Sequence, residues 1–199
     1  MSSRARTEFD DAYYDRYYRD PSTRVSDAED TVRLARFVLS YLDYLGVPVE
    51  GALDMGCGVG RWGQALKALR PAIEYTGVEI SKAMCQQYGW HHGSVAEWRS
   101  DPADLVICHG VLQYLSDADA KAAIENLARH AHGALYLEVV TQEDWDHNVN
   151  QKLTDGVINL RRASWYRRRL AKHFHSAGGG VYLPRDGHVV LYELERGAE

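Results

Sequence analysis

The chain has 199 residues, of which 45% are apolar and 26% charged. That length is typical of one domain, which can bury a full core without disulfides or a structural metal. The formal net charge of -5 disfavours nucleic acid as the main partner, because binding a phosphate backbone takes a basic surface. No apolar run approaches the ~20 residues of a membrane-spanning helix, and the N-terminus has no apolar stretch typical of a signal peptide. We therefore expect a protein that does not enter a membrane. Three cysteines form no paired framework and are typical of a reducing compartment, so we expect the protein in the cytoplasm.

The N-terminal part predicts two helices. Residues 9–19 favour a short helix that ends at Asp20-Pro21, because the residue before proline avoids helical dihedrals. A capping box of Ser26 and Glu29 predicts the start of a second helix, which apolar residues at helical spacing continue as far as Gly46.

From residue 51 onward, short apolar runs alternate with amphipathic helices. The predicted strands are residues 52–54, 75–80, 90–92, 104–108 and 134–140. The predicted helices are residues 61–69, residues 81–88, and one that begins at Ser116, with Asp119 as its capping partner, and ends at Gly133. This alternation predicts an α/β domain with a mostly parallel sheet covered on both faces.

The C-terminal part predicts a different ending. A basic helix is expected over residues 161–173. Strands over residues 180–183 and 188–195, joined by the turn residues 184–187, then predict an antiparallel hairpin. The positive run at residues 161–172 would guide an anionic substrate or form a solvated helix face.

A glycine loop is the most informative motif. Asp54 ends the first strand, and Gly56, Gly58 and Gly60 follow before a helix begins at Arg61. Glycines there let a ligand lie against bare backbone at the carboxyl end of a strand. The dinucleotide fingerprint fails, since Arg61 stands where its third glycine belongs, and a carboxylate at Asp54 suits a ligand with an ammonium group better than a pyrophosphate.

The second strand ends in Glu79, where an acidic residue would accept hydrogen bonds from ribose hydroxyls, and Ile80 offers an apolar surface for a purine. With this arrangement, the sequence resembles the class I S-adenosylmethionine (SAM) dependent methyltransferases. The resemblance extends from residue 51 onward and includes the fourth-strand segment 105–115, although Ser94 replaces the usual acidic residue after the third strand.

The resemblance implies a single Rossmann-like domain with seven strands in the order 3-2-1-4-5-7-6, the last antiparallel. Residues 1–46 would form an N-terminal helical lid and residues 47–199 the SAM-binding domain. The implied cofactor-binding residues are Asp54, Gly56, Cys57, Gly58, Glu79, Ile80, Ser94, Val95 and His109. Lid and substrate contacts are expected from Tyr13, Tyr14, Tyr17, Gln113 and Tyr114, for which plain packing is the alternative.

Methyl transfer depends on placing an acceptor in line with the methyl group, and an oxygen acceptor usually also needs a base. The candidates are His109, which could instead be a wall of the pocket, and His147, which could instead be a solvated loop residue. We expect transfer to O or N of a small-molecule acceptor, by a monomer or homodimer without a metal. The alternatives are a SAM-fold protein without catalysis and an enzyme that methylates a macromolecule.

Overall fold

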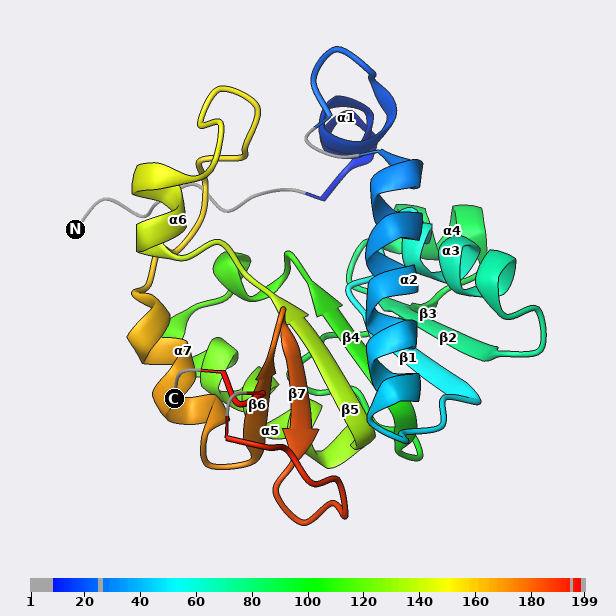
Figure 1. The fold of residues 1–199 in the computed structure, drawn as a ribbon. Helices are drawn as coiled ribbons and strands as arrows, with labels where there is room; N and C mark the ends of the chain where they lie inside the picture. Colours follow the sequence, from blue (N-terminus) through cyan, green and yellow to red (C-terminus); the bar gives the residue numbers. More distant parts are fainter. Residues whose placement is uncertain (1–8, 25–26, 194, 198–199) are drawn as a thin grey trace.

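A seven-stranded sheet forms the centre of the computed structural model, which describes residues 9–24, 27–193 and 195–197 (Figure 1). The strands are β1 (Gly51–Met55), β2 (Glu74–Glu79), β3 (His91–His92), β4 (Ala103–His109), β5 (Ala131–Glu138), β6 (Phe174–Gly178) and β7 (Val181–Pro184). Their spatial order is β3-β2-β1-β4-β5-β7-β6, and β7 runs antiparallel to both of its neighbours. The predicted fold class and strand order are therefore confirmed.

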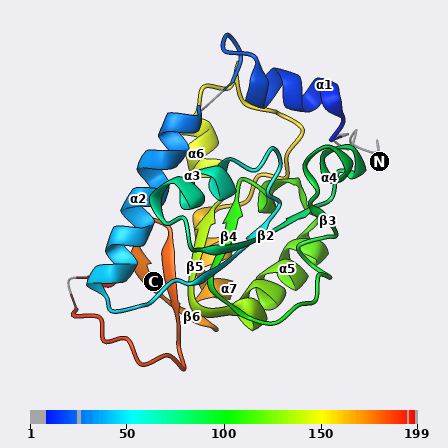
Figure 2. The same ribbon diagram turned by 90° about the vertical axis from the view of Figure 1, so that its right-hand side faces the viewer.

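Helices cover both faces of the sheet (Figures 1 and 2). The α-helices are α1 (Asp11–Tyr14), α2 (Ala28–Tyr44), α3 (Arg61–Leu69), α4 (Lys82–Tyr88), α5 (Asp117–His130), α6 (Gln142–His147) and α7 (Ala163–Leu170). Two shorter turns are the π-helical η1 (Asp15–Arg19) and the 3-10 turn η2 (Leu112–Tyr114). In the described part of the chain, no helix is long and apolar enough to cross a membrane.

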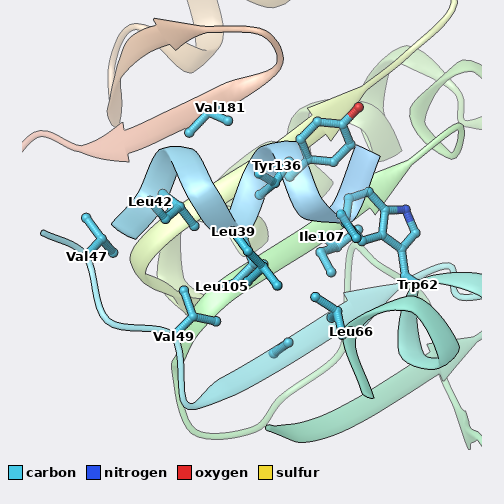
Figure 3. Close-up of a cluster of buried hydrophobic side chains, with 14 of the residues drawn as sticks. Leu39, Leu42, Val47, Val49, Trp62, Leu66, Leu105, Ile107, Tyr136 and Val181 are labelled. Atoms are coloured by element: carbon cyan, nitrogen blue, oxygen red, sulfur yellow. The ribbon is translucent and has the colours of Figure 1, made fainter. Parts of the chain in front are cut away.

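Helices α2 and α3 cover one face. The buried side chains of Leu39 and Leu42 on α2 belong to the same apolar cluster as Leu66 of α3 and Leu105 and Ile107 of β4 (Figure 3). Replacing one such fully buried leucine by alanine costs about 2–5 kcal/mol, so α2 is held on the sheet by its apolar face. The division of the chain at residue 46 stays a prediction.

The start of α2 differs from the predicted one. The side chain of Asp27 accepts a hydrogen bond from the Asp30 amide, and the Asp30 side chain accepts one from the Asp27 amide. Ser26, the predicted cap, lies outside the described residues. The capping box thus belongs to two aspartates one position further along the chain.

Helices α5 and α7 cover the other face. Along β4, Val106 and Cys108 pack among the side chains of α5 and α7, while Leu105 and Ile107 pack toward α2. This alternation is the two-residue period of a strand, and it continues to the last residue, His109. Residues two positions apart in a strand lie on the same face of the sheet. The face on which the last side chain of a strand lies therefore follows from the faces of the residues before it.

The predicted C-terminal hairpin is wrong. The hairpin consists of β6 and β7, joined at Gly178–Gly180, so the predicted strand 188–195 is not a strand where it is described. Val189 and Leu191 still pack on the α2 face, and this burial gives the segment its apolar alternation without a ladder. The polar stretch after β5 contains α6, which begins in a capping box of Thr141 and Asp144.

Both α1 and α6 lie beyond the carboxyl ends of the parallel strands (Figures 1 and 2). In open α/β sheets, ligands bind at this edge. The predicted helix 9–19 is present here as the short α1, capped by Asp10, followed by the single turn η1. The candidate site therefore lies between these N-terminal turns and the strand ends.

Candidate active site

The glycine loop follows β1 directly and connects it to α3. Gly56 and Gly58 have φ values of 94° and 54°, which other residues adopt only with strain. A Cβ atom on Gly56 would lie 2.3 Å from Cγ2 of Val111, so the loop needs glycine there for space as well. The result is a backbone turn that is bare toward the end of the sheet.

Asp54 stands at the start of this loop and is only 1% exposed. The hydroxyl of Tyr75 donates to its Oδ2 over 2.7 Å. Burial of the carboxyl group raises the pKa of Asp54 to about 7, against the lowering effects of Tyr75 and His109. Asp54 is therefore a buried acid that titrates near neutral pH.

Glu79, at the end of β2, is 3% exposed. Its Oε2 accepts a hydrogen bond from the Gly58 amide over 2.8 Å, and its Oε1 accepts one from the Ser81 amide over 2.9 Å. The carboxylate therefore joins the glycine loop to the start of α4, where Ser81 is the N-cap. A carboxylate has about four lone-pair sites, so Glu79 can accept further hydrogen bonds.

Two cavities flank the loop. The first, which we call the Glu79 cavity, has a volume of about 340 Å³ and is lined by Ile80, Ser94 and Val95, among others. The second, which we call the Glu138 cavity, has a volume of about 350 Å³ and is lined by Asp54 and Glu138, among others. Six residues line both, namely Tyr13, Tyr18, Gly56, His109, Gly110 and Tyr114. The two cavities are therefore neighbouring halves of one site.

Tyrosines from α1 and η1 cover this site. The hydroxyl groups of Tyr13 and Tyr114 are 2.8 Å apart, which connects α1 to the turn after β4. Tyr14 is buried, and its ring edge would touch a Cβ atom on Gly58 at 3.4 Å. Tyr17 lines the Glu138 cavity. All three predicted lid residues thus lie at the site.

His109 is the last residue of β4 and pairs in register with Glu138, the last residue of β5. The indole Nε1–H of Trp62 donates to His109 Nδ1 over 2.9 Å, and His109 Nε2 lies 3.2 Å from Glu138 Oε1. Because an indole can only donate, Nδ1 is the unprotonated nitrogen, and Nε2 carries the proton that Glu138 accepts. Neutral His109 therefore has no lone pair left for a substrate proton.

Glu138 receives a second hydrogen bond, from the Tyr136 hydroxyl to Oε2 over 2.9 Å. The hydrogen bond from His109 is the main cause that holds the pKa of Glu138 below its usual range. Its side chain is 57% exposed, so this fixed carboxylate faces the cavity and stays ionised at neutral pH.

The turn after β4 supplies Gln113, which is only 6% exposed. Its Nε2 donates to the Gly110 carbonyl over 2.9 Å, but its Oε1 has no hydrogen-bond partner and is fully buried. The backbone amide of Asn159 donates to the Gln113 carbonyl, so the loop before α7 holds this turn in place.

His147 and the basic run lie elsewhere. His147 is exposed at the end of α6 and lines neither cavity, so its role as a base stays a prediction that this arrangement does not support. No residue of the run from Arg161 to Lys172 lines them either. Arg161 is buried instead, and its guanidinium donates to the carbonyls of Leu112 and Leu115.

Sequence reasoning missed Glu138, Trp62 and Asp155 of the Glu138 cavity. The alternation along β5 was the available signal for Glu138, because Ala134 and Tyr136 face α2 and the same parity ends at Glu138. No local sequence pattern indicates that Trp62 or Asp155 belongs to the site, since each reaches the site through tertiary contacts.

Comparison with known proteins finds methyltransferases. A family model described as "Methyltransferase domain" matches residues 53–133, which contain the glycine loop, Glu79 and His109. The trans-aconitate 2-methyltransferase of Klebsiella pneumoniae is 34% identical over 99 residues, 46% of this chain and 38% of that protein. Residues 53–133 thus match a methyltransferase domain, in line with the resemblance to the class I SAM-dependent methyltransferases. The chain spans about two fifths of the length of this curated relative.

Solved structures share the methyltransferase fold. DesVI of Streptomyces venezuelae is 14% identical, with a TM-score of 0.62 over 78% of this chain and 92% of that one. An amino pentose methyltransferase of Micromonospora echinaspora, solved with SAM bound, is 22% identical, with a TM-score of 0.50 over 57% of this chain and 52% of that one. The amino pentose methyltransferase thus binds SAM, which is the cofactor predicted for this chain.

Proposed function

We propose that this methyltransferase binds SAM across both cavities and transfers its methyl group to an O or N atom of a small molecule, with S-adenosylhomocysteine (SAH) as the second product. One observation carries the proposal: two buried carboxyl groups, Asp54 and Glu79, flank a bare glycine loop between two joined cavities. Each cavity is within the usual size range of small-molecule sites.

The residues present fit the cofactor. Gly56 and Gly58 line the Glu79 cavity with backbone that carries no side chain, which is suited to a close ligand. Glu79 would accept the ribose hydroxyls, and Ile80 and Val95 would pack on the adenine ring in the Glu79 cavity. Asp54 would bind the ammonium group of the methionyl part, and the Arg61 guanidinium in the Glu138 cavity would bind its carboxylate.

SAM supplies an electrophilic methyl group on a sulfonium sulfur. The chain's contribution is to hold the acceptor in line with that methyl group and to exclude water, and positioning can supply on the order of 7 to 11 kcal/mol of the barrier. Tyr13 and Tyr18 line both cavities, so we propose that α1 and η1 form the lid over the reacting groups. His109 would position Glu138 by its Nε2–H rather than act as the base.

The test is calorimetric titration of the full chain with SAM and SAH. Asp54→Ala and Glu79→Ala should each weaken binding at least about tenfold, because a hydrogen bond to a charged group contributes about 1.5–3 kcal/mol and tenfold is 1.4 kcal/mol. Glu74→Ala is the matched control, since Glu74 is exposed at the other end of β2. Unchanged affinity in both site variants, or no binding by the wild type, would refute the cofactor site.

The remaining proposals concern partners and place. A small acceptor suits the volume of the Glu138 cavity, about 350 Å³, and a monomer or homodimer stays the expected state. The cytoplasm is the compartment we propose, because Cys57, Cys85 and Cys108 are unpaired thiols.

A further inference from the structure

We propose that the acceptor is a small molecule with a basic amine, whose nitrogen is held by Glu138 and Gln113 and methylated there. This inference rests on the proposed function and specifies its substrate class. It comes from the charges and hydrogen-bonding groups that line the Glu138 cavity.

The described lining of this cavity is acidic. It contains the carboxyl groups of Asp30, Asp54, Glu138 and Asp155, against the single cation Arg61. Asp30 is paired with Arg33, and Asp54 and Arg61 are assigned to the methionyl part of SAM. Glu138 then remains for the acceptor, and Asp155 adds its negative charge to the lining. A cavity with this balance attracts a cation and repels an anion.

The buried Oε1 of Gln113 is the second and independent observation. It is a buried acceptor without a partner, although buried polar atoms nearly always have one, and Gln113 is among the residues that line the same cavity. Its own Nε2 is already used by the Gly110 carbonyl, so the orientation of the amide is fixed. A ligand that donates N–H groups would satisfy Oε1, whereas a carboxylate ligand has nothing to donate.

Glu138 is prepared to receive the same group. His109 and Tyr136 each donate to one of its oxygens, which keeps the carboxylate ionised and oriented but leaves lone pairs on both oxygens. Asp155 is buried, with Oδ1 accepting a hydrogen bond from the Val157 amide, and it lines the cavity together with Tyr13 and Tyr114. The two carboxylates therefore face a space lined by tyrosines.

The chemistry of methyl transfer to nitrogen matches these charges. The acceptor enters as an ammonium ion and loses one proton to solvent, after which the nitrogen lone pair forms the new N–C bond. The C–S bond breaks, and its electron pair stays on sulfur to give SAH. Positive charge thus moves from sulfur to nitrogen, and a carboxylate beside the nitrogen stabilises that change in the transition state.

The proposal separates this chain from its curated relative. By name, that protein acts on trans-aconitate, which carries several carboxylate groups. Among the described residues lining the Glu138 cavity, Arg61 is the one cationic side chain, which cannot neutralise such a substrate together with the methionyl carboxylate. We therefore expect trans-aconitate to be neither bound nor methylated.

The experiment uses matched sets of probes with the full chain. One set is phenethylamine, phenethyl alcohol and phenylacetate, another is cyclohexylamine, cyclohexanol and cyclohexanecarboxylate, and trans-aconitate and a lysine-containing peptide are added. Calorimetry first establishes SAH binding, and ligand-observed NMR then measures which probes bind the SAH-loaded protein. SAH release from SAM measures which probes are methylated.

We expect the amine of each set to bind at least about tenfold more tightly than its alcohol or carboxylate. Glu138→Gln should reduce amine binding about tenfold or more while SAH affinity changes less than about twofold, and Asp155→Asn should act in the same direction. Glu74→Gln is the matched control, and circular dichroism checks that each variant is folded.

Several results would overturn the proposal. These are equal or tighter binding of alcohols, carboxylates or trans-aconitate, no binding of any amine to the SAH-loaded protein, and binding of the lysine peptide alone. Loss of SAH affinity together with amine binding in Glu138→Gln would also do so. Failure of the wild type to bind SAH is a different result, because it refutes the proposed function itself.

Discussion

The buried carboxyl group of Asp54 should make the affinity for SAM rise with pH between about 5 and 7. Without the cofactor its pKa is about 7, so near pH 6 most molecules carry a protonated Asp54. An opposite charge within ~4–6 Å lowers the pKa of a carboxyl group by about 1–3 units, and the ammonium group of SAM is such a charge. Binding must then release a proton, and it weakens as the pH falls.

The magnitude follows from these values. If the pKa falls from about 7 to about 5 on binding, the dissociation constant at pH 6 should be roughly eightfold higher than near pH 7.5. Binding at pH 6 should also release nearly one proton. Asp54→Asn removes the titrating group, so its weaker affinity should be flat across this range. Asp101→Asn, at an exposed position outside both cavities, is the matched control.

Calorimetry in two buffers of different ionisation enthalpy measures both quantities, since the difference in heat counts the released protons. A wild-type affinity that stays constant from pH 5.5 to 7.5, with no proton release, would refute the reasoning. So would an equal pH dependence in Asp54→Asn, because the titrating group would then lie elsewhere.

The same group affects the stability of the cofactor-free protein with the opposite sign. Its folded-state pKa lies above the unfolded value, so the folded state binds more protons between pH 4 and 7 and becomes less stable as the pH rises through that range. The cost reaches on the order of 4 kcal/mol at pH 7. Urea unfolding should therefore show that the difference between the wild type and Asp54→Asn changes with pH, while Asp101→Asn follows the wild type.

Two further predictions concern positions that hold the site in place. Gly56→Ala should lower the free energy of unfolding by about 2 kcal/mol or more in urea titrations, because its Cβ meets Val111 at 2.3 Å and its φ is 94°. Gly46→Ala, with a similar φ but open space, should cost only about 1 kcal/mol. Arg161→Met should lower the free energy of unfolding by about 2–4 kcal/mol and raise KM for the acceptor more than KM for SAM. Arg162→Met, at an exposed position, should change neither the free energy of unfolding nor KM. Equal effects of the two substitutions would contradict this.

The glycine loop and the strand order could be predicted because both are local patterns. Asp54 ends one apolar run and Glu79 ends the next, and the carboxyl ends of parallel strands meet at one edge. The C-terminal hairpin could not be placed in the same way. Phe174–Gly178 mixes polar and small residues, while the apolar alternation at Val189 and Leu191 reflects burial against the α2 face alone.

The contacts that give the site its chemistry are of another kind. The end of the fourth strand makes His109 a candidate base or a wall of the pocket, but a ring nitrogen can act as a base only with a free lone pair, and Trp62 occupies it. That contact joins α3 to β4 across 47 residues, so no spacing rule contains it. Strand parity, by contrast, puts Asp54, His109 and Glu138 on the face covered by α2, because each shares its parity with neighbours that pack there. A carboxylate at the end of β5 on that face reaches the Glu138 cavity, whereas the residue before it, Leu137, packs in the opposite core. The charge that we propose selects the acceptor is therefore set by one position in the strand, and a shift of one residue would replace it with an apolar side chain.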